Sequence, residues 1–325
     1  RCFPLRRFMV GFLFLSIAVV LGLPCVFNGQ IPVRFFSGAT IVRVYLHGED
    51  KTVKMPLEDY LVGVVAAEMP AEFSLEALKA QAVAARTFAV KRLGAGGVEN
   101  PLHPGADLCD DHRHGQAWLS REELKERWGT LQYYQYYYKV KQAVDETRGQ
   151  VLTYQGQLID PAYHASCGGQ TENSEDVWKF KVPYLRSVPC PYETDPEPCH
   201  AVSFSFEQVD QALGTTLSAV PASGKQNSPP EIKAAEKTAT GRPKSLLIGG
   251  RSFPAVAVRD LLGLRSTNFT WRVENGEITF TTTGYGHGVG LCQYGAKGLA
   301  LHGYNYRTIL GHYYSGAERS EERRV

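Results

Sequence analysis

The sequence predicts an α+β fold in which strands and helices are mixed, preceded by one N-terminal transmembrane helix. Residues 40–46 alternate apolar and polar side chains as a strand does, whereas residues 57–68 repeat apolar side chains at helical spacing. The two kinds of segment follow each other without the regular strand–helix–strand order of a parallel sheet. With 325 residues and a net charge of +2, the chain can hold one large or two moderate domains, and it gives no indication of nucleic-acid binding.

The N-terminal segment has the composition of a membrane anchor. Residues 8–27 are uncharged and mostly apolar, and about 20 such residues suffice to cross a bilayer. Arginines precede this segment, which by the positive-inside rule places residues 1–7 in the cytoplasm. We therefore expect residues 28–316 and a charged tail, 317–325, outside the cytoplasm. A cleaved signal peptide is the alternative, although no small-x-small cleavage pattern follows the apolar run.

The remaining elements are predicted from local patterns. Residues 218–243 are rich in Pro, Ser, Gly, Lys and Ala, which predicts an exposed insertion or linker. In chain order, we expect strands at 40–46 and 52–55, two helices within 57–86, a Gly-, Pro- and His-rich loop at 94–116, helices at 120–127 and 132–147, and a hairpin of 150–154 with 157–159.

Glu68 is the residue that the local pattern singles out for catalysis. Leu57, Leu61 and Val64 mark the apolar face of the first helix, and Glu68 falls on that face because it lies four residues after Val64. Pro70 ends the helix directly behind it. Burial and the negative end of the helix dipole both disfavour a charged carboxylate there. A carboxylic acid that keeps its proton near neutral pH is suited to general acid catalysis.

The second helix carries polar side chains on a surface otherwise built from small residues. Lys79 and Arg86 lie seven residues apart beside a seam of mainly alanines, and Gln81 leaves by another side. This distribution suits a polyhydroxylated or anionic ligand. The alternative is that Glu68 is structural and forms an ion pair with Lys79 or Arg86.

Two further segments contain residues that bind metals or ligands in other proteins. His103, Cys109, His112 and His114 combine nitrogen and sulfur ligands within twelve residues, which taken alone is a weak zinc motif. The glycines of residues 284–290 permit positive φ or close approach of a ligand, and their spacing fits neither a phosphate loop nor a dinucleotide-binding loop.

His287, within that glycine-rich segment, is either a ligand-binding or a structural histidine. The chain has seven cysteines, which do not form a dense disulfide framework. Cys190 and Cys199 bracket a proline-rich loop and are either paired or free thiols.

Two blocks of sequence together resemble one known family. The first contains LEDYLVGVVAAEMP from Leu57 and EALKAQAVAART from Glu76, and the second reads GYGHGVGLCQYGA from Gly284. Followed by GYNY and HYYSG, they resemble the stage II sporulation protein D family, the engulfment lytic transglycosylases of endospore-forming bacteria. The resemblance covers most of residues 40–316 and implies a glycan-binding cleft.

The resemblance implies an activity and a set of site residues. The family cleaves peptidoglycan glycan strands already stripped of stem peptides and leaves 1,6-anhydro-muramic acid ends. Its catalytic acid corresponds to Glu68, with no cofactor needed for the chemistry. The positions that it associates with substrate are Lys79, Gln81, Arg86 and Tyr163, together with Ser166 and His287.

The resemblance also implies a structural zinc and partners. His103, Cys109 and His114 match the family's zinc ligands, whereas Gly115 stands where the family has a further cysteine. The expected location is the membrane of the sporulation septum. The expected partners are glycan strands, a cell-wall amidase and a membrane scaffold protein.

Two other functions remain open from the sequence. In a hydrolytic muramidase, Glu68 would work with a second carboxylate such as Glu72, Glu172 or Asp176. In a non-catalytic cell-wall scaffold, Glu68 would only bind glycan. Anhydro or reducing product ends distinguish the two enzymatic reactions.

Overall fold

The computed structural model describes most of the chain beyond residue 39. The described residues are 40–94, 103, 105–111, 115–218 and 232–320. The predicted cytoplasmic segment 1–7 and transmembrane helix 8–27 lie outside the described residues, as do His112 and His114. Within the described ranges, no helix is both long enough and apolar enough to cross a bilayer. The membrane anchor therefore stays a prediction.

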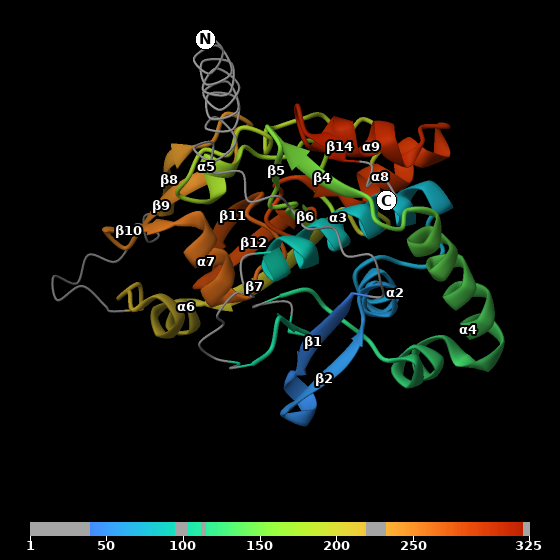
Figure 1. Cartoon of the computed structure of the whole chain (residues 1–325). Coiled ribbons are helices and arrows are strands. Elements are labelled where there is room, and N and C mark those ends of the chain that lie inside the picture. Colours follow the sequence, from blue (N-terminus) through green and yellow to red (C-terminus); the bar gives the residue numbers. More distant parts are fainter. Residues whose placement is uncertain (1–39, 95–102, 104, 112–114, 219–231, 321–325) are drawn as a thin grey trace, which may run out of the picture. The chain divides into compact units, whose positions relative to one another are not determined.

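The described chain begins with a small sheet of three strands in the order β2-β1-β3. Strand β1 (Ile41–Leu46) pairs antiparallel with β2 (Lys51–Pro56) and parallel with β3 (Leu108–Cys109). The short 3-10 helix η1 (His47–Glu49) turns the chain between β1 and β2, which lie side by side in Figure 1. The predicted strand pair is thus confirmed, and β3 brings the loop that carries Cys109 onto the same sheet.

Helices form the larger of two hydrophobic cores. Helix α2 (Leu57–Glu68) packs against α3 (Leu75–Gly94) and α4 (Arg121–Glu146). The alanine seam of α3 is fully buried, and such small side chains allow the neighbouring helices to approach closely. The fully buried alanines of α3 are Ala77, Ala80, Ala82, Ala84, Ala85 and Ala89.

Helix α4 joins the two helices that the sequence predicts at 120–127 and 132–147. Ser120 begins it with a capping box, in which the Ser120 side chain and Glu123 satisfy each other's backbone N–H groups. Gly129 interrupts the helix with φ 70° and ψ 163°, outside the helical region. The two predicted helices are therefore real, but they follow each other across a kink.

Short strands and two helices complete this core. The predicted hairpin is confirmed as β4 (Val151–Tyr154) with β5 (Gln157–Leu158), and β14 (Glu318–Ser320) adds the beginning of the charged tail to β4. Strand β6 (Tyr163–His164) pairs parallel with β13 (Leu291–Cys292). The helices that follow β13 and pack against α3 are α8 (Gln293–Leu301) and α9 (Tyr306–Tyr313).

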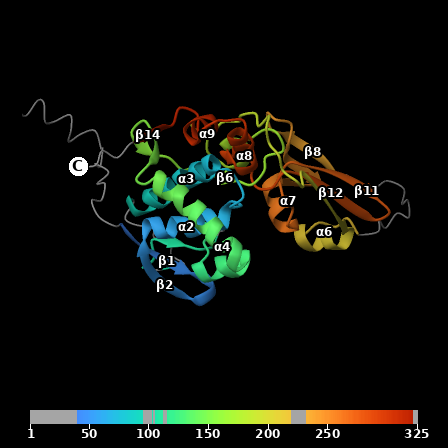
Figure 2. The same ribbon diagram turned by 90° about the vertical axis from the view of Figure 1, so that its right-hand side faces the viewer.

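A second hydrophobic core lies among strands from the later part of the chain. One sheet has the order β11-β12-β7 and another the order β10-β9-β8, with α6 and α7 beside these strands in Figure 2. The short helix α5 (Ser174–Val177) precedes these elements in the chain. The strands and helices of the second core are β7 (Cys199–Ser205), α6 (Phe206–Leu213), β8 (Ile232–Lys237), β9 (Pro243–Ile248), β10 (Arg251–Pro254), α7 (Ala255–Leu262), β11 (Phe269–Glu274) and β12 (Glu277–Thr283).

The observed architecture is a mixed α+β fold, as the sequence predicts. Of the expected insertion 218–243, residues 232–237 form β8, which pairs with β9, and residues 219–231 lie outside the described part. Cys190 and Cys199 are both free thiols, and only Cys199 is exposed. The structure therefore shows no disulfide bond between Cys190 and Cys199.

Candidate active site

Glu68 is the last residue of α2, as its sequence position predicts. The helix ends there because Met69 is extended and Pro70 follows it. The Glu68 side chain is partly exposed, and its Oε1 accepts hydrogen bonds from the Ala117 N–H (2.8 Å) and the Tyr163 hydroxyl (3.2 Å). Both of these donors are on Oε1.

Tyr163 links Glu68 to two other segments of the chain. Its hydroxyl donates to Glu68 and accepts from the Gln116 side-chain amide (2.9 Å). Desolvation, reinforced by the Glu68 charge, raises the pKa of Tyr163 well above its ordinary value. The tyrosine therefore stays neutral and keeps donating its proton toward Glu68. The strand that carries Tyr163, β6, fixes this geometry through its pairing with β13.

His287 lies next to Tyr163, on the glycine-rich loop that precedes β13. Its Nδ1 accepts from the Val289 N–H (3.1 Å), and the ring interacts with the backbone of Tyr163. Desolvation and the nearby Arg259 charge lower the pKa of His287 to about 4, so the ring is neutral. The glycines are required here: φ is positive at Gly286, where a Cβ would collide with the side chain of His164.

Ser166 is buried and bound to a carboxylate that the sequence analysis did not identify. The Ser166 hydroxyl donates to Glu193 Oε1 at 2.6 Å. The same carboxylate accepts from the N–H groups of Cys167 (2.7 Å) and Gly169 (2.6 Å). Glu193 therefore holds the turn after β6 in place, and Ser166 is part of this support.

The side chains of Lys79 and Gln81 interact with residues other than Glu68. Lys79 forms ion pairs with Glu76 (2.8 Å) and Glu146 (2.6 Å), and its side chain is only 12% exposed. Gln81 is fully buried, and its Oε1 accepts from the Gln293 amide at 3.3 Å. Its own Nε2 has no hydrogen-bond partner among the described residues. A contact with substrate at either position stays a prediction.

Arg86 is buried between helices. Its guanidinium forms two hydrogen bonds to the Glu58 carboxylate, at 3.1 and 2.7 Å, and a third to the Val144 carbonyl at 3.1 Å. Its side chain is 1% exposed. These contacts join α2, α3 and α4, which is the arrangement expected of a structural ion pair.

The carboxylates considered as a second catalytic group are placed in different surroundings. Glu172 is completely buried and pairs with Arg242 Nε at 3.0 Å, with a hydrogen bond from Thr240. Asp176 pairs with Lys244 at 3.1 Å. Glu72 is exposed on the segment between α2 and α3.

The predicted zinc loop is described only in part. His103 is buried and stacks on Tyr45 with ring centroids 3.8 Å apart, and the Cys109 sulfur accepts from the Asp111 N–H at 3.4 Å. An N–H donor to sulfur stabilises a metal-binding thiolate, so these residues fit a zinc site. A Cβ at Gly115 would collide with the Cys109 carbonyl oxygen, so this backbone has no room for the cysteine that the resemblance implies there.

A pocket of about 280 Å³ lies beside α2, lined by residues of β2, α2 and the start of α4. Its lining includes Asp59, Gly63 and Trp118, and Glu68 is not among the lining residues. A glycan-binding cleft at Glu68 therefore stays a prediction.

Gln116, His164 and Glu193 are site residues that the sequence analysis did not identify. Gln116 is the last residue of the predicted Gly-, Pro- and His-rich loop 94–116, and His164 adjoins Tyr163, so proximity to predicted residues was an available signal for both. Glu193 lies in the proline-rich loop between Cys190 and Cys199, and no local pattern distinguishes it.

A carboxyl group at a helix end, held by a neutral tyrosine and a backbone N–H, defines a candidate acid–base site on an α+β scaffold.

The family model described as "Stage II sporulation protein" matches residues 45–154. The chain is 38% identical over 281 residues to stage II sporulation protein D of Bacillus amyloliquefaciens, covering 86% of this chain and 78% of that protein. The chain is also 37% identical over 281 residues to stage II sporulation protein D of Bacillus subtilis (strain 168). The match covers 86% of this chain and 79% of that protein.

The chain is also similar to a protein with a different name. The amidase enhancer of Bacillus subtilis (strain 168) is 30% identical over 305 residues, which cover 79% of this chain and 39% of that protein. Because it is 38% and 37% identical to the two stage II sporulation D proteins over most of their length, the chain belongs to the stage II sporulation protein D family. Sporulation is therefore the process in which this family acts.

Proposed function

We propose that this chain is a membrane-anchored lytic transglycosylase that cleaves peptidoglycan glycan strands stripped of stem peptides. The observation that carries the proposal is the geometry of Glu68, whose Oε1 is held by Ala117 and Tyr163 at the end of α2. The helix C-terminus and partial burial favour the neutral acid, and the two donors fix its orientation.

The reaction requires one group that first gives and then takes a proton. Glu68 donates its proton to the glycosidic oxygen as the bond from that oxygen to the anomeric carbon breaks. The C6 hydroxyl of the same muramic acid residue then attacks the anomeric carbon, and its proton passes to the Glu68 carboxylate. The product has a 1,6-anhydro ring, no water is consumed, and Glu68 is again an acid.

The placement of two of the three other carboxylates supports this mechanism over hydrolysis, and Glu72, which is exposed between α2 and α3, is the one that the product end-groups must test. A hydrolytic glycosidase needs a second carboxylate, as nucleophile or base, on the other side of the sugar ring. Glu172 is buried and bound to Arg242, and Asp176 is paired with Lys244, so neither suits that role. The remaining assignments to substrate, Lys79, Gln81, Arg86, Ser166 and His287, are predictions of the family resemblance.

Mass spectrometry of the products from purified glycan strands tests the proposal. We expect anhydro-muramic acid ends from strands without stem peptides and far fewer from strands that retain them. Reducing ends would identify a hydrolytic muramidase. Binding of strands with no cleavage would identify a scaffold.

The name of the amidase enhancer relative supports a partnership with a cell-wall amidase. The apolar segment 8–27 supports a membrane anchor with residues 1–7 in the cytoplasm and residues 28–325 outside it, and the septal location is an implication of the family resemblance. An alkaline phosphatase fused after residue 325 should therefore be active in cells, and an inactive fusion of normal abundance would contradict this topology.

Tyr163→Phe should reduce kcat/KM about fivefold, because it removes one hydrogen bond that orients Glu68, worth about 1 kcal/mol. The alkaline limb of the pH–rate profile should also move to higher pH, because the carboxylate loses a donor that favours its charged form. Tyr138→Phe, an exposed tyrosine of α4, is the matched control. An unchanged rate and pH profile in Tyr163→Phe would show that the hydroxyl does not position Glu68.

A structural zinc would be held by His103, Cys109 and His114, with a water or His112 completing the tetrahedron because Gly115 cannot coordinate. Cys109→Ser should then lower the melting temperature and the zinc content of the purified chain. Cys199→Ser, which changes an exposed thiol, should do neither. Equal zinc content in the two variants would contradict a zinc site in this loop.

A further inference from the structure

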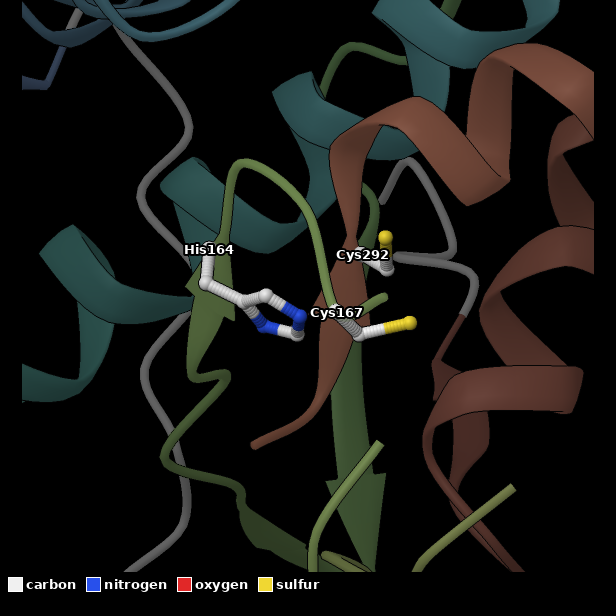
Figure 3. A group of neighbouring side chains, drawn as sticks. All are labelled: His164, Cys167 and Cys292. Carbon is white, nitrogen blue, oxygen red and sulfur yellow. The ribbon is translucent and has the colours of Figure 1, made fainter. Parts of the chain in front are cut away.

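Three buried residues near Tyr163 bring metal-binding atoms together. A ring nitrogen of His164 and the sulfurs of Cys167 and Cys292 all lie within 4.8 Å of one another. The three residues are 5%, 1% and 0% exposed. Figure 3 shows the ring of His164 extending from β6 toward the two cysteines. Cys292 is the direct partner of His164 in the parallel pairing of β13 with β6, so the backbone fixes this juxtaposition.

The hydrogen bonding of His164 leaves one nitrogen suited to a metal. Its Nδ1 lies 3.1 Å from the Val289 carbonyl oxygen. A carbonyl only accepts, so Nδ1 carries the proton and Nε2 has the free lone pair. Nε2 is buried and has no hydrogen-bond partner among the described residues. A histidine that ligates a metal typically donates its other ring N–H to a carbonyl or carboxylate in this way.

A fourth candidate ligand, the third sulfur, is next to the two cysteines. The Cys190 thiol is 4% exposed, and its side chain interacts with those of both Cys167 and Cys292. Its sulfur lies 3.3 Å from the Tyr313 hydroxyl, which would donate to a thiolate. Neighbouring ligands of a tetrahedral zinc with zinc–sulfur bonds near 2.3 Å are roughly 3.4–3.8 Å apart. A small contraction therefore suffices for His164, Cys167 and Cys292, whereas Cys190, which lies outside the group of atoms within 4.8 Å, must move closer to complete the site.

The charge around the cluster also suits a cation. Glu193 Oε2 lies 3.3 Å from the Cys167 sulfur, and Oε1 lies 3.4 Å from the Cys292 sulfur. In the absence of metal, both thiols keep their protons and donate to this carboxylate. A divalent cation would displace the thiol protons, and with three thiolates it would form a centre of net charge −1. The Glu193 carboxylate would then be held by the Ser166 hydroxyl and the N–H groups of Cys167 and Gly169.

We propose that His164, Cys167, Cys190 and Cys292 form a closed structural site for a thiophilic divalent metal, with Zn²⁺ as the ion that best fits three sulfurs and one imidazole. This site is separate from the loop that contains His103 and Cys109. It joins β6, the turn after it and β13, and it therefore braces the strand that carries Tyr163.

Cobalt(II) substitution tests the site in the purified full-length chain. The background variant is Cys109→Ser, which removes the loop site, and Co²⁺ alone is added after treatment with a chelator. We expect one Co²⁺ per chain, with a sulfur-to-cobalt charge-transfer band, intense tetrahedral d–d absorption and loss of both on addition of Zn²⁺. Cys292→Ser in this background should lose the bound ion and the bands, whereas Cys199→Ser, an exposed thiol outside the cluster, should keep both.

Melting temperatures separate metal binding from misfolding. In chelator, Cys292→Ser and the background variant should melt at similar temperatures. Zn²⁺ should raise the melting temperature of the background only, because an ion that binds only the native state stabilises it. A Co²⁺ spectrum unchanged by Cys292→Ser, or no bound metal at all, would overturn the proposal. So would a disulfide within the cluster, detected as thiols that resist alkylation in the denatured, unreduced chain.

Discussion

Replacing Glu68 by Gln is expected to reduce turnover by about 10²–10⁴, the usual contribution of a positioned general acid. Glutamine keeps the size of the side chain and an oxygen that can accept from Ala117 and Tyr163. It lacks the transferable proton, and in the proposed mechanism it also lacks the base that takes the proton of the C6 hydroxyl. The variant should fold and bind glycan strands, yet release almost no anhydro-ended product.

The matched control is Glu126→Gln, an exposed glutamate of α4. Product end-groups, strand binding and melting temperature should be measured together for both variants. Near wild-type turnover in Glu68→Gln would show that the proposed mechanism is wrong. A loss of activity that accompanies unfolding would instead identify Glu68 as a structural residue.

The part of the site that sequence predicts is the part that depends on local structure. The end of α2 at Glu68 follows from apolar spacing and from Pro70, both within one helix. The hairpin of β4 and β5 and the capping box at Ser120 are equally local. Each of these features depends on residues within a few positions of one another, so its pattern is visible without the fold.

The partners of the polar side chains could not be predicted in the same way. Tyr163 and Glu68 are 95 positions apart, and Gln293 and Gln81 are 212 apart. Only the pairing of β6 with β13 and the packing around α3 bring such residues together. The helical pattern showed that Arg86 flanks the alanine seam, but the sequence did not show that Glu58 would be opposite it.

Arg86 therefore supplies a test that distinguishes a structural from a substrate-binding residue. Arg86→Met keeps much of the side-chain volume and leaves the Glu58 carboxylate, 16% exposed, without its guanidinium partner. Breaking a buried ion pair from one side typically costs 3–5 kcal/mol, so we expect the free energy of unfolding to fall by about 3 kcal/mol. Glycan affinity, measured on the folded fraction, should not change.

Two further variants decide the cause of that loss. Adding Glu58→Gln to Arg86→Met removes the uncompensated charge and should recover much of the stability, because the main penalty is the unpaired carboxylate and not the missing attraction. Arg148→Met breaks an exposed pair with Asp145 and should cost less than about 1 kcal/mol in denaturant unfolding. If Arg86→Met were instead as stable as the unmodified chain and bound glycan more weakly, the guanidinium would act on substrate, and the ion pair with Glu58 would have to open when substrate binds.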